Sequence, residues 1–157
     1  MLYVVKALLD GACNAIDDFA SQSKLFIKGE LGAIIKKDAV YTCCYFISSD
    51  DMISSEELSF LSDITGETVR PEEVSAMIAS KEKLTFMISQ TYNKLKMLDI
   101  EMGTYNLRSS AAYQYIAFLK SFSIFITGVD GVKKHELYEI KEFFEPFDSR
   151  ISEIPKQ

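Results

Sequence analysis

Acidic and hydroxyl side chains crowd into one short stretch of the sequence, FISSDDMISSEE, at residues 46–57. Carboxylates so closely spaced can bind a divalent cation, work as an acid–base pair, or stabilise the positive end of a helix. Ser54 stands three residues before Glu57, and an apolar run follows. This is the capping-box pattern, in which the serine oxygen accepts from the backbone amide of the glutamate and the glutamate carboxylate accepts from the serine amide. Capping therefore accounts for this turn, in which Asp50 and Asp51 also precede the positive helix end.

Other chemistry is poorly supported by the residues present. An EF-hand needs ligands at alternating loop positions, a central glycine and a terminal bidentate glutamate, and DDMISSEE lacks this order. The chain has a single histidine, His135, and no CxxC pair, so zinc and Cys-His chemistry lack their usual ligands. No glycine-rich phosphate loop is present, and nothing supplies an oxyanion donor beside the carboxylates. The sequence predicts a protein that is not an enzyme and needs no cofactor.

A second acidic turn, TGVDGVKK, follows the most apolar stretch of the chain. Its Asp130 and the nearby Glu136 match Asp51 and Glu57 when the two turns are aligned. Each turn comes after an apolar run that ends in aromatic residues. We therefore predict a degenerate two-fold repeat of helix, acidic turn and helix, with both turns at the same end of the protein.

Apolar residues recur at three- and four-residue steps along nearly the whole chain, which predicts helices and no strands. Four long runs and two shorter ones have this spacing: residues 2–20, 31–47, 81–102 and 111–127, and residues 58–64 and 71–80. The 111–127 run is apolar on nearly all sides, so we expect this helix at the centre of the protein.

A last amphipathic helix carries Leu137, Ile140, Phe144 and Phe147 on one face. We expect it to end near Pro146, because proline interrupts helical hydrogen bonding. The predicted fold class is all-α: a single-domain bundle of six to seven helices. It covers residues 1–157, of which 148–157 form a tail.

Charge and composition narrow the classes of function. The chain has 23 acidic and 17 basic residues, a formal net charge of −6, and no run of more than two Lys or Arg. A nucleic-acid-binding surface needs the opposite charge. The most apolar segment, 109–129, holds Lys120 near its middle, which predicts a buried helix and no membrane span. Cys13, Cys43 and Cys44 lie in apolar helical runs, as expected for small core residues in a reducing cytoplasm.

The stretch FISSDDMISSEELSFLSDITGETVRPEEV and the second turn together resemble the tellurite-resistance TerB-like domain. In that domain a helix, an Asp-Gly-x-Ile-Ser-x-x-Glu turn and another helix occur twice. The likeness is closest to the version found N-terminal to certain bacterial AAA-type ATPases, and it covers about residues 31–147. It implies an all-helical, cytoplasmic domain that is not an enzyme. Some members are associated with divalent metal at the acidic turns, and with membrane-stress or phage-defence complexes.

The metal site that the resemblance implies consists of five acidic residues: Asp50, Asp51, Glu57, Asp130 and Glu136. The second turn has Val129 at the position of the leading acid and Lys133 at that of the capping serine. A weak divalent site is therefore the most that the resemblance implies for this chain.

These observations predict a TerB-like interaction module that binds another protein, either free-standing or as the amino-terminal part of a larger ATPase system. Two alternatives stay open. One is an immunity or antitoxin-like protein, whose acidic surface would neutralise a basic toxin by charge complementarity. The other is a divalent-metal-binding stress protein.

Overall fold

The computed structural model describes residues 2–47, 59, 62–63, 81–105, 107–127 and 134–152. These residues contain five long helices and no strand: α1 (Leu2–Ser21), α2 (Glu30–Ile47), α5 (Lys81–Met102), α6 (Ala111–Thr127) and α7 (Lys134–Ser152). The described part is all-α, as predicted. Residues 59, 62 and 63 are also helical, inside the short run expected at 58–64. Within the described ranges, every helix is too short or too polar to cross a membrane.

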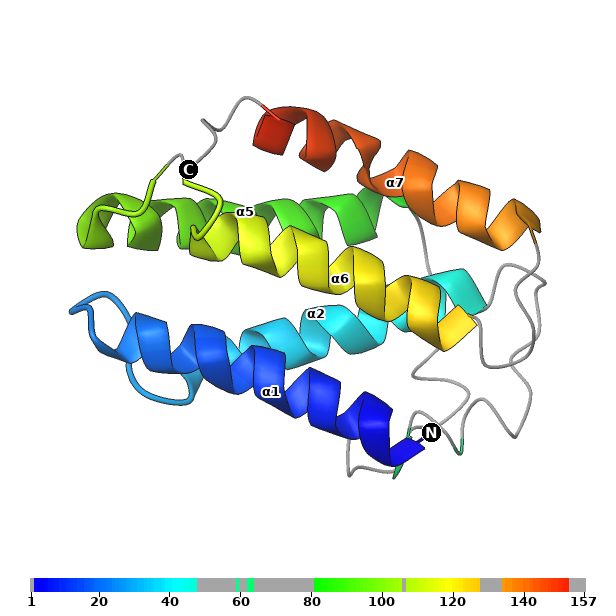
Figure 1. Ribbon diagram of the computed structural model, residues 1–157, viewed down its shortest axis with the longest axis horizontal. Helices are drawn as coiled ribbons and strands as arrows, with labels where there is room; N and C mark the ends of the chain where they lie inside the picture. Colours follow the sequence, from blue (N-terminus) through cyan, green and yellow to red (C-terminus); the bar gives the residue numbers. More distant parts are fainter. Residues whose placement is uncertain are drawn as a thin grey trace.

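Helices α2 and α6 share the centre of the bundle. α6 packs against α1, α2, α5 and α7, and α2 packs against α1, α5, α6 and α7. Figure 1 shows α2 and α6 across the middle of the molecule, with α1 and α7 on opposite sides. Ile116 and Leu119 of α6 are fully buried. The prediction of a central 111–127 helix is therefore confirmed, and α2 joins it there.

Helix α7 continues through Pro146, so the prediction that it ends near this proline is wrong. An interior proline costs a helix about 3 kcal/mol, because it removes a hydrogen bond and crowds the preceding turn. Phe144 and Phe147 stand on either side of it, three residues apart, and both are buried. Burial of each ring contributes about 1.5–3 kcal/mol. Both rings reach the core together only if the helix continues, and their combined burial offsets the cost of Pro146.

The α1–α2 hairpin is closed by a buried aspartate. Asp17 in α1 accepts hydrogen bonds from the backbone amide of Gly29, at 3.0 and 2.9 Å, and from that of Gly32, at 3.0 Å. These amides form the positive end of α2, which favours a carboxylate. Gly29 has φ of +92°, a conformation that L side chains rarely adopt. A Cβ atom at Gly32 would lie 3.2 Å from the Asp17 Cβ, so the close approach also depends on glycine.

The α5–α6 hairpin is closed in the same way. Asp99 in α5 accepts from the backbone amides of Ala111, at 2.7 Å, and Ala112, at 3.0 Å. Thr104 donates its hydroxyl to the same carboxylate at 2.8 Å. Ser110 completes the cap by accepting from the Tyr113 amide at 3.2 Å. Each hairpin thus uses an aspartate of its first helix to hold the N-terminus of its second.

Candidate interaction surface

The acidic residues predicted as a metal site fall outside what the structure describes. Asp50, Asp51, Glu57 and Asp130 lie in undescribed segments, and Glu136 belongs to α7 without a described side chain. Elsewhere, among the described residues, no group of three or more His, Cys, Asp or Glu side chains is placed to hold a metal ion. That both acidic turns lie at the same end of the protein stays a prediction, and so does the weak divalent site.

The weak divalent site can be tested by thermal melting. We expect calcium or magnesium to raise the melting temperature slightly at millimolar concentration and not at micromolar concentration. A ligand that binds only the native state, at a hundredfold excess over its dissociation constant, adds about 2.7 kcal/mol of stability. A large rise at micromolar metal that Asp51→Asn abolishes would contradict the weak-site prediction.

A buried carboxylate that sequence analysis missed joins three helices. Asp38 Oδ2 in α2 accepts from the Thr91 hydroxyl of α5 at 2.6 Å and from the Tyr115 hydroxyl of α6 at 2.7 Å. Burial raises the pKa of the Asp38 carboxyl, and these two hydrogen bonds lower it in part. Burial also raises the pKa of the Tyr115 phenol, which therefore stays protonated and able to donate.

The Asp38 cluster has almost no surface at which a substrate could arrive. The Asp38 side chain is 2% exposed, and Tyr115 is fully buried. The cluster therefore ties α2, α5 and α6 together, and it is a poor candidate for a catalytic site. A signal was present in the sequence, because Asp38 follows Leu31 and Ile35 at helical spacing and so lies on their buried face.

The cysteines likewise belong to the core. Cys13, Cys43 and Cys44 are buried free thiols. Burial raises the pKa of Cys13 and of Cys44 to about 12, and it raises that of Cys43 as well. The thiolate is the reactive form of cysteine. These side chains are therefore protonated near neutral pH and act as small core residues, as the sequence predicted for Cys43 and Cys44.

One helix carries large apolar residues on the side away from the core. The buried side of α5 includes Leu84, Ile88, Leu95 and Leu98. At 100° per residue, the opposite side holds six exposed residues, of which Glu82 in the first turn is charged. The five uncharged ones we call the α5 outer face: Phe86, Gln90, Asn93, Met97 and Ile100.

The α5 outer face is uncharged and strongly exposed. Phe86 is 64% exposed, Met97 60% and Ile100 62%. Its five positions span about 21 Å along the helix, at a rise of 1.5 Å per residue. A solvent-facing helix side normally carries charged or polar residues. Met97 and Ile100 are neighbours on this face, and Gln90 and Asn93 separate them from Phe86. Exposed apolar groups that gather on one helix side can mark a surface that binds other molecules.

Lysines border this face on both sides, although the chain as a whole is acidic. Lys83 and Lys94 lie on one border together with Glu101, and Lys96 lies on the other. The Lys96 ammonium stands over the rings of Tyr92, at 5.8 Å, and Tyr105, at 5.9 Å. These contacts hold its aliphatic stem against the helix surface.

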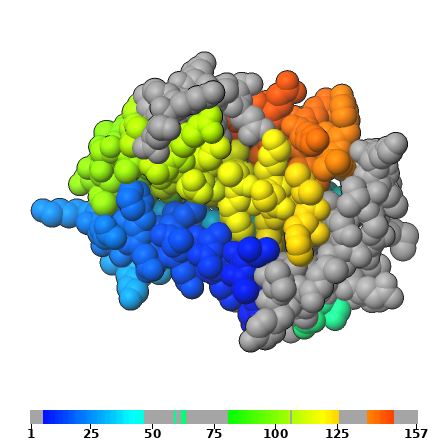
Figure 2. Space-filling view, viewed as in Figure 1, coloured from blue at the N-terminus to red at the C-terminus, as the bar shows by residue number. Residues whose placement is uncertain are grey.

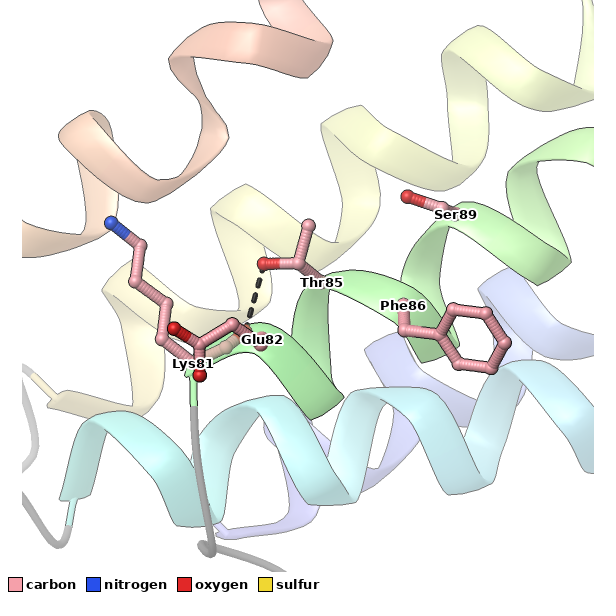
Figure 3. Close-up of a pocket in the computed structure, with 5 residues that line it drawn as sticks. All are labelled: Lys81, Glu82, Thr85, Phe86 and Ser89. Atoms are coloured by element: carbon pink, nitrogen blue, oxygen red, sulfur yellow. Dashed lines mark hydrogen bonds between the residues drawn. The ribbon is translucent and has the colours of Figure 1, made fainter.

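A shallow hollow adjoins the N-terminal end of the α5 outer face (Figure 3). Its described lining comes from α5 alone: Lys81, Glu82, Thr85, Phe86 and Ser89. Figure 3 shows the Phe86 ring projecting from the helix, away from the Lys81 and Glu82 side chains. The Thr85 hydroxyl donates to the Lys81 carbonyl at 2.8 Å. The hollow therefore has an aromatic ring on one side and charged groups on the other. The α5 helix also reaches the surface at its C-terminal end, seen in green in Figure 2.

Comparisons of the chain with protein-family models, with curated proteins and with solved structures gave no match. In its described part this is therefore an all-helical protein with large apolar side chains exposed on the outer side of α5.

Proposed function

We propose that this protein is a non-enzymatic, all-helical interaction module that binds another protein through the α5 outer face. One observation carries the proposal: Phe86, Met97 and Ile100 are each more than half exposed on the helix side opposite the core. Burial of one such side chain is worth about 1.5–3 kcal/mol. A partner that covers all three side chains is therefore stabilised by the free energy of apolar burial, and a few such residues contribute most of the binding energy of a protein–protein contact.

We further propose a TerB-like module with a two-fold repeat and six to seven helices, working in a bacterial stress or defence system or beside an AAA-type ATPase. The two hairpins support the repeat, because Asp17 and Asp99 cap α2 and α6 in the same way. Inside these capped helices, Thr42 and Ser123 each donate a hydroxyl to the carbonyl four residues earlier. The acidic turns support the TerB-like assignment on sequence.

A pull-down from cells of the source species tests the proposed binding surface. The double variant Phe86→Asp/Met97→Asp should lose partners that the unaltered chain retains, since truncation of a central contact residue often costs 2 kcal/mol or more. The matched control is Tyr138→Asp in α7, because Tyr138 is 67% exposed and lies on another helix. Both proteins should melt close to the unaltered chain, because exposed substitutions change stability by about 0.5 kcal/mol or less. Equal partner capture by both variants would contradict the assignment to α5.

A further inference from the structure

We infer that a second copy of this chain covers the α5 outer face by pairing its own α5 antiparallel to the first. The inference rests on the proposed function, because it names one partner for the same surface. Two copies related by a two-fold axis present the same patch to each other, so a self-complementary face is what such a contact requires.

The spacing of the face is that of a coiled-coil seam. Steps of four, three, four and three residues separate Phe86, Gln90, Asn93, Met97 and Ile100. Residues at alternating steps of three and four form the packed seam of paired helices. Most of α5 already buries its other side in this protein, so the seam is a second, independent stripe on the same helix.

An antiparallel pair matches the seam residue by residue. With Phe86 opposite Met97 of the second copy, Gln90 falls opposite Asn93 of that copy, and the two-fold axis repeats both pairs. Phe86 and Met97 then meet each other, while Ile100 meets the Lys83 stem of the second copy. The two amides meet at the centre, where each supplies a donor and an acceptor for the other. A polar pair inside a seam also specifies the register.

The charges fit the antiparallel arrangement and not the parallel one. In the antiparallel register, the Lys83 stem lies beside Ile100 of the second copy and its ammonium beside Glu101 of that copy. Lys94 and Lys96 come opposite the uncharged Met87 and Ser89. A parallel pair would instead set Lys83 directly against Lys83 of the second copy, and like charges facing each other in a seam are unfavourable.

The contact should be weak and reversible. A seam of about 21 Å gives less than the roughly 1,600 Å² of a standard stable interface. Each copy also carries a net charge of −6, so the copies repel each other at low salt. We expect a dissociation constant on the order of 10 µM or weaker, and tighter association as salt is added.

Sedimentation velocity of the full chain tests the inference, between about 5 and 500 µM in reducing buffer. The unaltered protein and Tyr138→Asp should shift from monomer toward dimer over this range, and Met97→Asp should stay monomeric. A monomer at every concentration, or a dimer that Met97→Asp leaves intact, overturns the inference. The first outcome leaves the proposed function standing if Phe86→Asp/Met97→Asp still loses a partner in the pull-down, so the two failures are distinguishable.

Cross-linking tests the register without disturbing the apolar positions. Gln90→Cys and Asn93→Cys proteins, oxidised after mixing, should form a disulfide with each other faster than either forms one with itself. The natural thiols are buried and should not compete. Faster self-linking of Gln90→Cys indicates a parallel pair and overturns the antiparallel assignment.

Discussion

Replacement of Asp99 by alanine is expected to lower the free energy of unfolding by about 3–5 kcal/mol. The buried carboxylate accepts from two amides at the start of α6 and from the Thr104 hydroxyl. Without it these donors stay buried and lose their partner, at the N-terminus of a central helix. In a chain of this size the melting temperature should fall by roughly 10 °C.

Chemical denaturation of matched variants measures this loss. Glu101→Ala is the control, because Glu101 is an exposed carboxylate two residues further along the same helix. It should change stability by about 0.5 kcal/mol or less. Asp99→Asn should fall between the two, since it keeps one acceptor oxygen and replaces the other by a donor. A loss below about 1 kcal/mol for Asp99→Ala would show that the cap does not hold α6 in place.

Replacement of Tyr115 by phenylalanine is expected to cost about 1.5–3 kcal/mol at neutral pH, the usual value of a hydrogen bond to a charged group. The change removes one of the two donors to Asp38 Oδ2 and leaves the ring in the core. The matched control is Tyr138→Phe, which removes a hydroxyl from an exposed ring. Equal stabilities of these two variants would contradict the conclusion that the hydrogen bonds of Asp38 stabilise the packing of α2, α5 and α6.

The same cluster predicts a definite dependence of stability on pH. Burial raises the folded-state pKa of Asp38 above its ordinary value of 3.8. The folded chain therefore holds this proton more tightly than the unfolded chain does. The contribution of Asp38 to stability is greatest below the unfolded pKa and falls as the pH rises through the folded pKa.

Asp38→Asn removes this dependence, because an amide does not ionise. We expect the stability of the variant relative to the unaltered protein to improve as the pH rises from about 4, and then to level off above the folded pKa. The loss caused by Tyr115→Phe should be smaller near pH 4 than at pH 7, since the lost hydrogen bond favours the charged carboxylate. Denaturation midpoints measured from about pH 4 to pH 8 test both trends. A difference that is flat or reversed in sign would show that Asp38 has no raised pKa in the folded chain.

Helix positions were largely predictable from the sequence, because the period of apolar residues is a local property. The predicted runs 81–102 and 111–127 coincide with α5 and α6. Gly103, with φ of +74°, ends α5 as a glycine commonly does. The prediction at Pro146 was wrong because the cost of a proline is local, whereas the burial that offsets it depends on distant residues. One of these is Phe46, whose ring centroid lies 6.3 Å from that of Phe144.

The polar contacts inside the bundle were not predictable in this way. Helical spacing can indicate that an acid such as Asp38 lies on a buried face, but it does not identify the groups that Asp17, Asp38 and Asp99 will each contact. Apart from Thr104, which is five residues from Asp99, their partners lie from 12 to 77 residues away in the chain. The functional site was predicted at the acidic turns because their carboxylates lie close together in the sequence. The role of Asp50, Asp51 and Glu57 stays a prediction.

The order of residues is enough to show that α5 has large apolar residues on two sides, since Leu84 and Ile88 follow one stripe and Phe86 and Met97 another. Which of the two stripes is covered depends on how the helices pack together. Hydrophobic burial has no direction of its own, so either stripe could have faced the core. Helices α2 and α6 pack against the first stripe of α5, and the Thr91 hydroxyl of α5 donates to Asp38 of α2. This packing buries the first stripe and leaves the α5 outer face in solvent.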